Sequence, residues 1–173
     1  MEREVKPSAE TRRGAAGPVD VPPEWNRVTA AIIGAAMEVH TILGPGLIER
    51  LYEEAMIHEL TLRGLSVGRQ VAIRLAYKGV PLGDQFIDLL VNGLVVVELK
   101  AVEAVSDTHL AQLVSYLRSA RIPLGLLINF NVLHLRQGIY RRVYSLNTPL
   151  PEVFHDTAFP PRTSATPAPS AFS

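Results

Sequence analysis

Apolar residues recur along the first third of the chain with the three- and four-residue spacing of an α-helix. This spacing runs from Val28 to Leu43 and predicts a helix over residues 26–43. The sequence Gly-Pro-Gly at 44–46 interrupts the pattern, and a second helix is predicted over 47–63. The folded part of the chain is therefore expected to begin with two consecutive helices.

Strand patterns follow the two helices. Runs of branched apolar residues, some alternating with polar ones, predict strands over 67–77, 84–91, 94–101 and 124–130, with a last ribbon from 132–136 and 139–144. Residues 78–83 are expected to turn the chain between the first two strands. A third helix is predicted over 107–120, with Ser106 or Asp107 as its N-cap and Pro123 beyond its end. The order ααβββαβ, followed by the ribbon, predicts an α/β fold with helices packed on a mixed sheet.

The distribution of proline separates this core from two tails. Of the 13 prolines, four lie within the first 23 residues and six lie between residues 149 and 169. Segments poor in large apolar residues and rich in Pro, Ser and Ala bury too little surface to fold. We therefore expect a disordered tail over 1–24, a folded domain over 25–146, and a disordered Pro/Ser/Ala-rich tail over 147–173.

Composition narrows the function classes. The 173 residues include 17 basic and 17 acidic side chains, so the net charge is zero, which argues against a strongly cationic nucleic-acid coat but not against a local charged site. The absence of Cys excludes disulfides, thiolate zinc sites and Cys nucleophiles. No apolar run approaches the roughly 18–20 residues that span a bilayer, and residues 1–20 lack the apolar segment of a secretory signal. These features predict a cytoplasmic protein with no membrane partner.

Three charged residues lie inside apolar strand patterns. Glu98 and Lys100 belong to the run LVVVELKAV and point to one face of the predicted strand, and Asp88 interrupts the run FIDLLV. Buried charge is costly unless it is paired or binds a metal. Two carboxylates offer the oxygen ligands that Mg²⁺ prefers, and a lysine beside them suits the charge that develops in phosphodiester hydrolysis. A structural ion pair or the solvated face of an edge strand is the alternative interpretation.

The hairpin between the second and third strands tests this interpretation. If Asn92 and Gly93 formed a simple two-residue turn, Asp88 would face Val97 and the two carboxylates would point to opposite sides. A bulge or an odd-length loop, such as a three-residue loop with Gly93 in the left-handed conformation, would place Asp88 and Glu98 on one face. We therefore predict an odd-length or bulged hairpin.

Two of the predicted helices present polar faces that would complete such a site. The second helix carries Glu49, Tyr52, Glu53 and Met56 on one face, and the third helix carries His109, Gln112 and Tyr116. Gln and Tyr donate hydrogen bonds to phosphate without adding charge. Taken singly, the two glutamates are more typical of a solvated helix face, and His109 is more typical of a capping or surface residue.

The ordered motifs resemble a known family. The sequence from Gly46 to Tyr52 fits the pattern GxxExxY, and Asp88, the Glu98-Leu-Lys100 motif and the run from Gln112 to Tyr116 follow in order. This set is similar to the GxxExxY protein family, a RecB-like branch of the PD-(D/E)XK nuclease superfamily, over about residues 28–143. The resemblance implies a restriction-endonuclease-like αβββαβ core with a central mixed sheet of about four strands flanked by helices.

The resemblance also implies roles for single residues. In that superfamily the equivalents of Asp88 and Glu98 bind Mg²⁺ or Mn²⁺, often with the carbonyl of Leu99, and the equivalent of Lys100 supports the attacking water. The equivalent of Glu49 approaches the metal directly or through water. The residues expected to position substrate are Gln112, Tyr116, Tyr52 and His109.

The sequence therefore predicts a metal-dependent nuclease that hydrolyses phosphodiester bonds of DNA or RNA, with nucleic acid as its partner and DNA ahead of RNA. A homodimer is compatible with the resemblance, although no sequence feature marks an interface. One alternative is a nucleic-acid-binding or protein-binding module that keeps the fold without turnover. A second alternative is a metal-free structural protein in which Asp88, Glu98 and Lys100 form a buried ion network.

Overall fold

A five-stranded mixed sheet forms the centre of the molecule in the computed structural model, which describes residues 21–144. The predicted tails over 1–20 and 147–173 lie outside the described residues, as do residues 145 and 146. The elements in chain order are α1 (Pro23–Leu43), α2 (Glu49–Leu62), β1 (Val67–Tyr77), β2 (Val80–Val91), β3 (Val95–Lys100), α3 (Asp107–Ala120), β4 (Leu124–Asn129), the 3₁₀ helix η1 (Leu135–Gly138) and β5 (Ile139–Val143).

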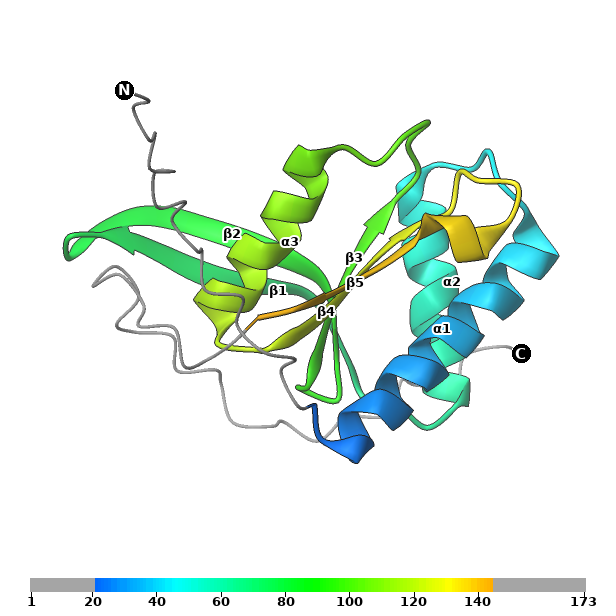
Figure 1. Ribbon diagram of the computed structural model, residues 1–173, viewed down its shortest axis with the longest axis horizontal. Helices are drawn as coiled ribbons and strands as arrows, with labels where there is room; N and C mark the ends of the chain where they lie inside the picture. The colour runs from blue at the N-terminus through cyan, green and yellow to red at the C-terminus, as the bar shows by residue number, and fades with distance from the viewer. Residues whose placement is uncertain (1–20, 145–173) are drawn as a thin grey trace, which may run out of the picture.

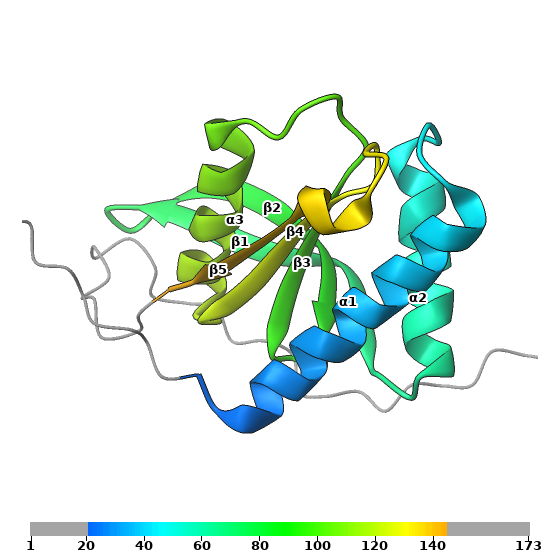
Figure 2. The same ribbon diagram turned by 45° about the vertical axis from the view of Figure 1, so that its right-hand side comes forward.

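The strands lie in the sheet in the order β1-β2-β3-β4-β5. Only β3 and β4 run parallel, because α3 connects them as a crossover, and every other neighbouring pair is antiparallel. Helices α1 and α2 cover one face of the sheet, and α3 covers the other (Figures 1 and 2). The predicted α/β fold with a restriction-endonuclease-like mixed sheet is confirmed.

Burial on both faces explains the sequence of the two central strands. Val95, Val97 and Leu99 face α1 and α2, whereas Val96 faces α3, so apolar side chains are needed on either side of β3. Every residue of β4 is likewise buried. Glu98 is the exception in β3, because it is charged and yet almost fully buried.

Two helix starts differ from the predicted ones for local reasons. Helix α1 begins at Pro23 rather than residue 26, since proline lacks only an N–H that the first helical turn leaves unpaired, and the predicted N-terminal tail therefore ends earlier. Helix α2 begins at Glu49 rather than residue 47, because the Leu47 N–H donates to the Tyr52 hydroxyl (3.2 Å) and Ile48 remains extended. Among the described helices, none has the length and apolar character needed to cross a bilayer.

The turn after β1 is shorter than predicted. Residues 80–83 belong to β2, and only Lys78 and Gly79, both with positive φ, turn the chain. Pro81 is accommodated because the β1–β2 register shifts beside it, where a missing N–H is tolerated. The outer part of this hairpin, residues 71–87, extends beyond β3, and we call it the hairpin arm (Figure 1).

The predicted strand over 132–136 is wrong. Leu133 is exposed and Leu135 is buried, and both belong to a loop that leads into η1 and its first turn rather than to a strand. Gly138 ends this loop against the backbone carbonyl of Asn129, an approach that leaves no room for a side chain. The loop is therefore held by close packing rather than by strand pairing.

Substitution of Gly138 tests this close approach. In Gly138→Ala the new methyl group would meet the Asn129 carbonyl oxygen, so we expect the unfolding free energy to fall by about 1–3 kcal/mol in urea titrations. Gly34→Ala is the control, because its methyl group meets only the flexible end of Arg63 and favours the helix. A Gly138→Ala protein as stable as wild type would contradict the packing argument.

Candidate active site

The hairpin between β2 and β3 sets the geometry of the site. Val91 pairs with Val95, so three residues form the loop, and its first two, Asn92 and Gly93, have φ values of 52° and 67°. The register continues through Leu89 and Val97 and places Asp88 opposite Glu98. The predicted odd-length hairpin is confirmed, and extending its register by one residue gives the alignment of the two carboxylates that the sequence predicts.

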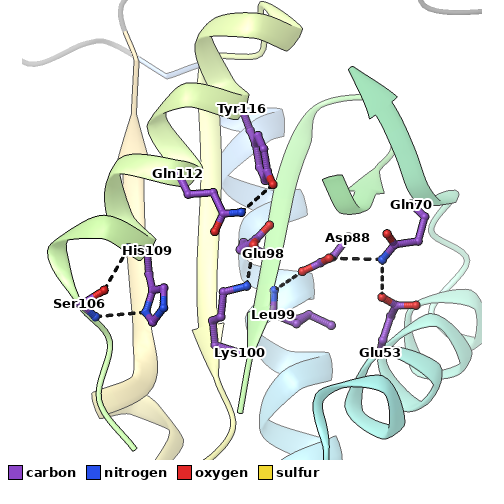
Figure 3. A network of polar contacts seen from close by, with 10 residues as sticks. All are labelled: Glu53, Gln70, Asp88, Glu98, Leu99, Lys100, Ser106, His109, Gln112 and Tyr116. Atoms are coloured by element: carbon purple, nitrogen blue, oxygen red, sulfur yellow. Dashed lines mark hydrogen bonds and ion pairs between the residues drawn. The ribbon is translucent and has the colours of Figure 1, made fainter. Parts of the chain in front are cut away.

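Asp88 lies where β2 separates from β3. Pairing of the two strands ends at Leu89 and Val97, so the next backbone donor on β3, the Leu99 N–H, has no partner on the β2 backbone. The Asp88 side chain takes this place, and its Oδ2 accepts the Leu99 N–H at 2.9 Å (Figure 3). The separation of the strands thus fixes the Asp88 carboxylate at the point where β2 and β3 diverge.

Glu98 and Lys100 point to the same side of β3 and form an ion pair. Lys100 Nζ lies 2.7 Å from Glu98 Oε1, and only 3% of the Glu98 side chain is exposed. The second oxygen, Oε2, is buried and has no hydrogen-bond partner among the described residues. An unsatisfied buried carboxylate oxygen is costly, so this oxygen would be stabilised by a further donor or a cation.

Burial changes the ionisation of both strand carboxylates, Glu98 and Asp88. Burial, together with the charge of Asp88, raises the pKa of Glu98 to about 7 although Lys100 opposes the shift. Burial also raises the pKa of Asp88, in spite of the hydrogen bond from Leu99. Each of these groups is therefore less easily ionised than in water, which is the signature of carboxylates held away from solvent.

Glu49 approaches the same centre from the first turn of α2. Burial raises the pKa of Glu49, the positive charge of Lys100 lowers it, and the negative charge of Asp88 raises it. Glu49 therefore interacts electrostatically with charged residues of both β2 and β3. A backbone hydrogen bond from Ala101 also acts on its carboxylate. The structure therefore brings the predicted Glu49 together with Asp88, Glu98 and Lys100.

Lys100 is the cation of this set. Burial lowers its pKa, but the hydrogen bond to Glu98 and the negative charges around it outweigh burial and raise the pKa above its ordinary value. The ammonium group is therefore charged at neutral pH. Lys100 can therefore stabilise negative charge, but it does not act as a neutral base that accepts a proton.

Gln112 and Tyr116 line the site from α3. The Gln112 Nε2 donates to the Tyr116 hydroxyl at 2.7 Å, and both side chains lie beside Glu98 (Figure 3). Burial and the negative charge of Glu98 raise the pKa of Tyr116, so its phenol stays protonated. These two predicted residues thus form a neutral, hydrogen-bonded pair over the carboxylates.

Two residues predicted to position substrate have other surroundings. The Tyr52 ring is fully buried and stacks on Phe130 at 4.4 Å, and its hydroxyl donates to the Gly44 carbonyl, so these contacts give the side chain a structural role. His109 Nδ1 accepts the Ser106 N–H at 3.2 Å in a capping box, as the capping alternative predicted. Tyr52 instead holds the loop before Glu49, and His109 starts α3.

One residue next to Asp88, Gln70 of β1, is absent from the residues that the sequence predicts for the site. Gln70 donates to Asp88 Oδ1 at 3.3 Å and to Glu53 Oε2 at 2.7 Å. Glu53 lies on the helix face that the sequence predicts, and its side chain is buried rather than solvated. The available signal was the pair Arg69-Gln70, two consecutive polar residues that break the alternation of β1.

The donor set can be compared with the needs of a divalent cation. As the side chains stand, the described residues contain no group of three or more His, Asp or Glu side chains arranged to hold a metal ion. Even so, the unsatisfied Oε2 of Glu98 and the raised pKa values of Asp88, Glu98 and Glu49 favour a positive charge among these oxygens. The residues present therefore fit a hard metal such as Mg²⁺ or Mn²⁺.

The fold and these residues define a restriction-endonuclease-like α/β domain with a nuclease-like site. The chain belongs to the PD-(D/E)XK nuclease superfamily, whose family model matches residues 26–143, more than half of the chain. No curated protein and no solved structure gives a match. The superfamily prediction is confirmed, and membership indicates a nuclease-like function that acts on nucleic acid.

The raised pKa of Glu98 predicts how stability depends on pH. Because the folded protein holds the Glu98 proton up to about pH 7 while the unfolded chain releases it near its ordinary value of 4.5, metal-free protein loses stability as pH rises through this window. This loss amounts to up to about 3 kcal/mol. Urea unfolding in EDTA at pH 5 and pH 8 measures it.

Glu98→Gln provides the reference for this measurement, since it cannot titrate. We expect wild type to lose stability relative to this variant between pH 5 and pH 8. The raised pKas of Asp88 and Glu49 act in the same direction and remain in both proteins. Parallel pH profiles for the two proteins would contradict the raised pKa of Glu98.

Proposed function

We propose that this protein is a metal-dependent nuclease of the GxxExxY family, in the RecB-like branch of the superfamily, which hydrolyses phosphodiester bonds of DNA or RNA. The observation that carries the proposal is the ion pair between the almost fully buried Glu98 and the partly buried Lys100 of β3, with the partly buried Asp88 of β2 beside it and one Glu98 oxygen left without a partner among the described residues. Such a cluster is poorly explained by stability alone, because buried ion pairs contribute little to it.

Mg²⁺ or Mn²⁺ is the proposed cofactor. Asp88 and Glu98, with the Leu99 carbonyl, would hold it, and Glu49 would complete the ligand set directly or through water. When bound, such a metal polarises a phosphate and lowers the pKa of a bound water. The unsatisfied Oε2 of Glu98 supports this assignment.

Lys100 and the α3 pair supply the remaining chemistry. The charged ammonium of Lys100 stabilises negative charge that develops on the phosphate, and it keeps the attacking water oriented. Tyr116 accepts the hydrogen bond from Gln112, which leaves its own O–H free to donate. Gln112 and Tyr116 thus position a scissile phosphate without bringing a second cation to the carboxylates.

The proposed partner is nucleic acid, with DNA ahead of RNA. A homodimer is proposed by analogy with nucleases that cut both strands of a duplex. The cysteine-free sequence suits the reducing cytoplasm, which is the proposed compartment.

Cleavage assays with paired variants test the function. Purified protein with Mg²⁺ or Mn²⁺ is expected to cut at least one substrate among single-stranded DNA, duplex DNA and RNA, and EDTA is expected to stop it. Asp88→Ala and Lys100→Ala should each lower the rate by about 100-fold or more, since each removes charge from the reacting centre. Gel or fluorescence assays over a time course measure the rates.

Matched controls lie on the hairpin arm. Asp84→Ala and Lys78→Ala remove the same charges from exposed positions and should leave the rate unchanged. If Asp88→Ala or Lys100→Ala cleaves as fast as wild type, a contaminating enzyme is responsible and the proposal fails. Nucleic-acid binding without cleavage under every metal would instead identify a binding module.

The alternative function is a metal-free structural protein with a buried ion network, and the 2.7 Å contact between Lys100 and Glu98 is also compatible with it. Calorimetric titration with Mn²⁺ separates the two cases, because a structural network predicts no binding. In such a network, Lys100→Ala would strongly destabilise the fold by leaving buried carboxylates unpaired. Under the proposed function the same variant stays folded and binds the metal at least as tightly as wild type.

A further inference from the structure

Gln70 has a backbone conformation that is unusual within a strand. Its φ is +46°, in the left-handed region that side chains other than glycine rarely adopt. The register of β1 and β2 would place it opposite Asp88, yet the ladder pairs only its neighbours, Arg69 with Leu89 and Val71 with Ile87. Such strain persists where the surroundings over-determine it, and it is concentrated at functional sites.

The side chain that results from this conformation bridges two carboxylates. Gln70 Nε2 donates to Glu53 Oε2 at 2.7 Å and to Asp88 Oδ1 at 3.3 Å (Figure 3). An amide nitrogen carries two hydrogens, so this arrangement uses both. Because the amide is neutral, it joins the two acids without the positive charge that would compete with a metal ion.

Glu53 is itself held on its other oxygen. Its Oε1 accepts a hydrogen bond from Arg69 Nε, and Arg69 Nη2 pairs with Glu54 Oε1 at 2.8 Å. Glu53 is buried, whereas Gln70 and Arg69 lie at the exposed margin of the site. Helix α2 therefore holds the Gln70 amide in place through Glu53.

The consequence falls on Asp88. One of its oxygens accepts the Leu99 N–H at 2.9 Å and the other accepts the Gln70 amide, so donors on two sides restrain rotation of the carboxylate. Each oxygen keeps a further lone pair. Partners of this kind around a metal ligand orient it and tune its affinity.

We propose that Gln70 is a positioning residue that orients the Asp88 carboxylate for a divalent cation, and that Glu53 acts through Gln70. This inference rests on the proposed metal-dependent function and adds two residues to it. It assigns a purpose to the strained conformation of Gln70, which strand pairing alone would oppose.

Gln70→Gly is the informative variant, because it removes the side chain that carries the amide while glycine adopts positive φ without strain. We expect calorimetry to show Mn²⁺ binding about 10- to 100-fold weaker than in wild type. The thermal midpoint of the metal-free protein should stay near that of wild type, since the lost side chain is exposed and the backbone strain is relieved. Lys78→Gly is the matched control, with a φ of 49° in the exposed turn and no contact with the site.

Kinetics distinguish positioning from substrate contact. At low Mn²⁺ the Gln70→Gly rate should fall with an unchanged KM for nucleic acid, and it should approach the wild-type rate when Mn²⁺ is raised. A raised KM that excess metal does not correct would overturn the proposal in favour of a contact with substrate.

A double-mutant cycle tests the role of Glu53. Glu53→Gln should weaken Mn²⁺ binding more in wild type than in Gln70→Gly, because the contribution that passes through the amide is already lost in Gln70→Gly, whereas the direct effect of the Glu53 charge on Asp88 and Glu49 remains in both. Additive losses would overturn the relay, and wild-type affinity in Gln70→Gly would overturn the whole inference. If wild type itself binds no Mn²⁺, the proposed function fails and this inference with it, an outcome distinct from failure of the variant alone.

Discussion

A carboxylate buried in the central strand of a sheet costs free energy that its surroundings must offset. Glu98 is in this position, between the layer of α1 and α2 and the layer of α3. Lys100 offsets part of the cost at one oxygen, and the other oxygen stays unsatisfied. Apolar residues in place of a buried ion pair are often as stable or more stable, so the fold alone gives little reason for a glutamate at this position.

The neighbouring elements are arranged around this carboxylate. The three-residue loop sets the register that brings Asp88 opposite Glu98, and the separation of β2 from β3 frees the Leu99 N–H for the Asp88 side chain. On the far side of the sheet, the buried ring of Tyr52 holds the loop that precedes Glu49. Irregular features of the backbone thus coincide with the charged residues, as is common where a fold supports a site.

Structural features that depend on neighbouring residues in the sequence were predictable, and those that depend on contacts between distant residues were not. The hairpin loop and the bounds of β1 and α3 follow from side-chain period, turn residues and caps, all of which are local. The left-handed Gln70 was not predictable, because its side chain bonds a glutamate 17 residues earlier in another element. The same holds for the η1 loop, whose shape depends on the approach of Gly138 to Asn129.

The charge balance of the site argues for a divalent rather than a monovalent cation. When ionised, the three carboxylates of Glu49, Asp88 and Glu98 carry three negative charges, and Lys100 carries one positive charge. The group therefore lacks two positive charges for neutrality. Gln70, Gln112 and Tyr116 are neutral donors and do not change this balance, and the nearby Glu53 is paired with Arg69. A single Mg²⁺ or Mn²⁺ would supply the two missing charges, and because burial raises the pKa of Glu98 to about 7, loss of the competing proton would favour metal binding as pH rises through this value. The zero net charge of the whole chain conceals this local excess of acid, because the compensating basic residues lie elsewhere.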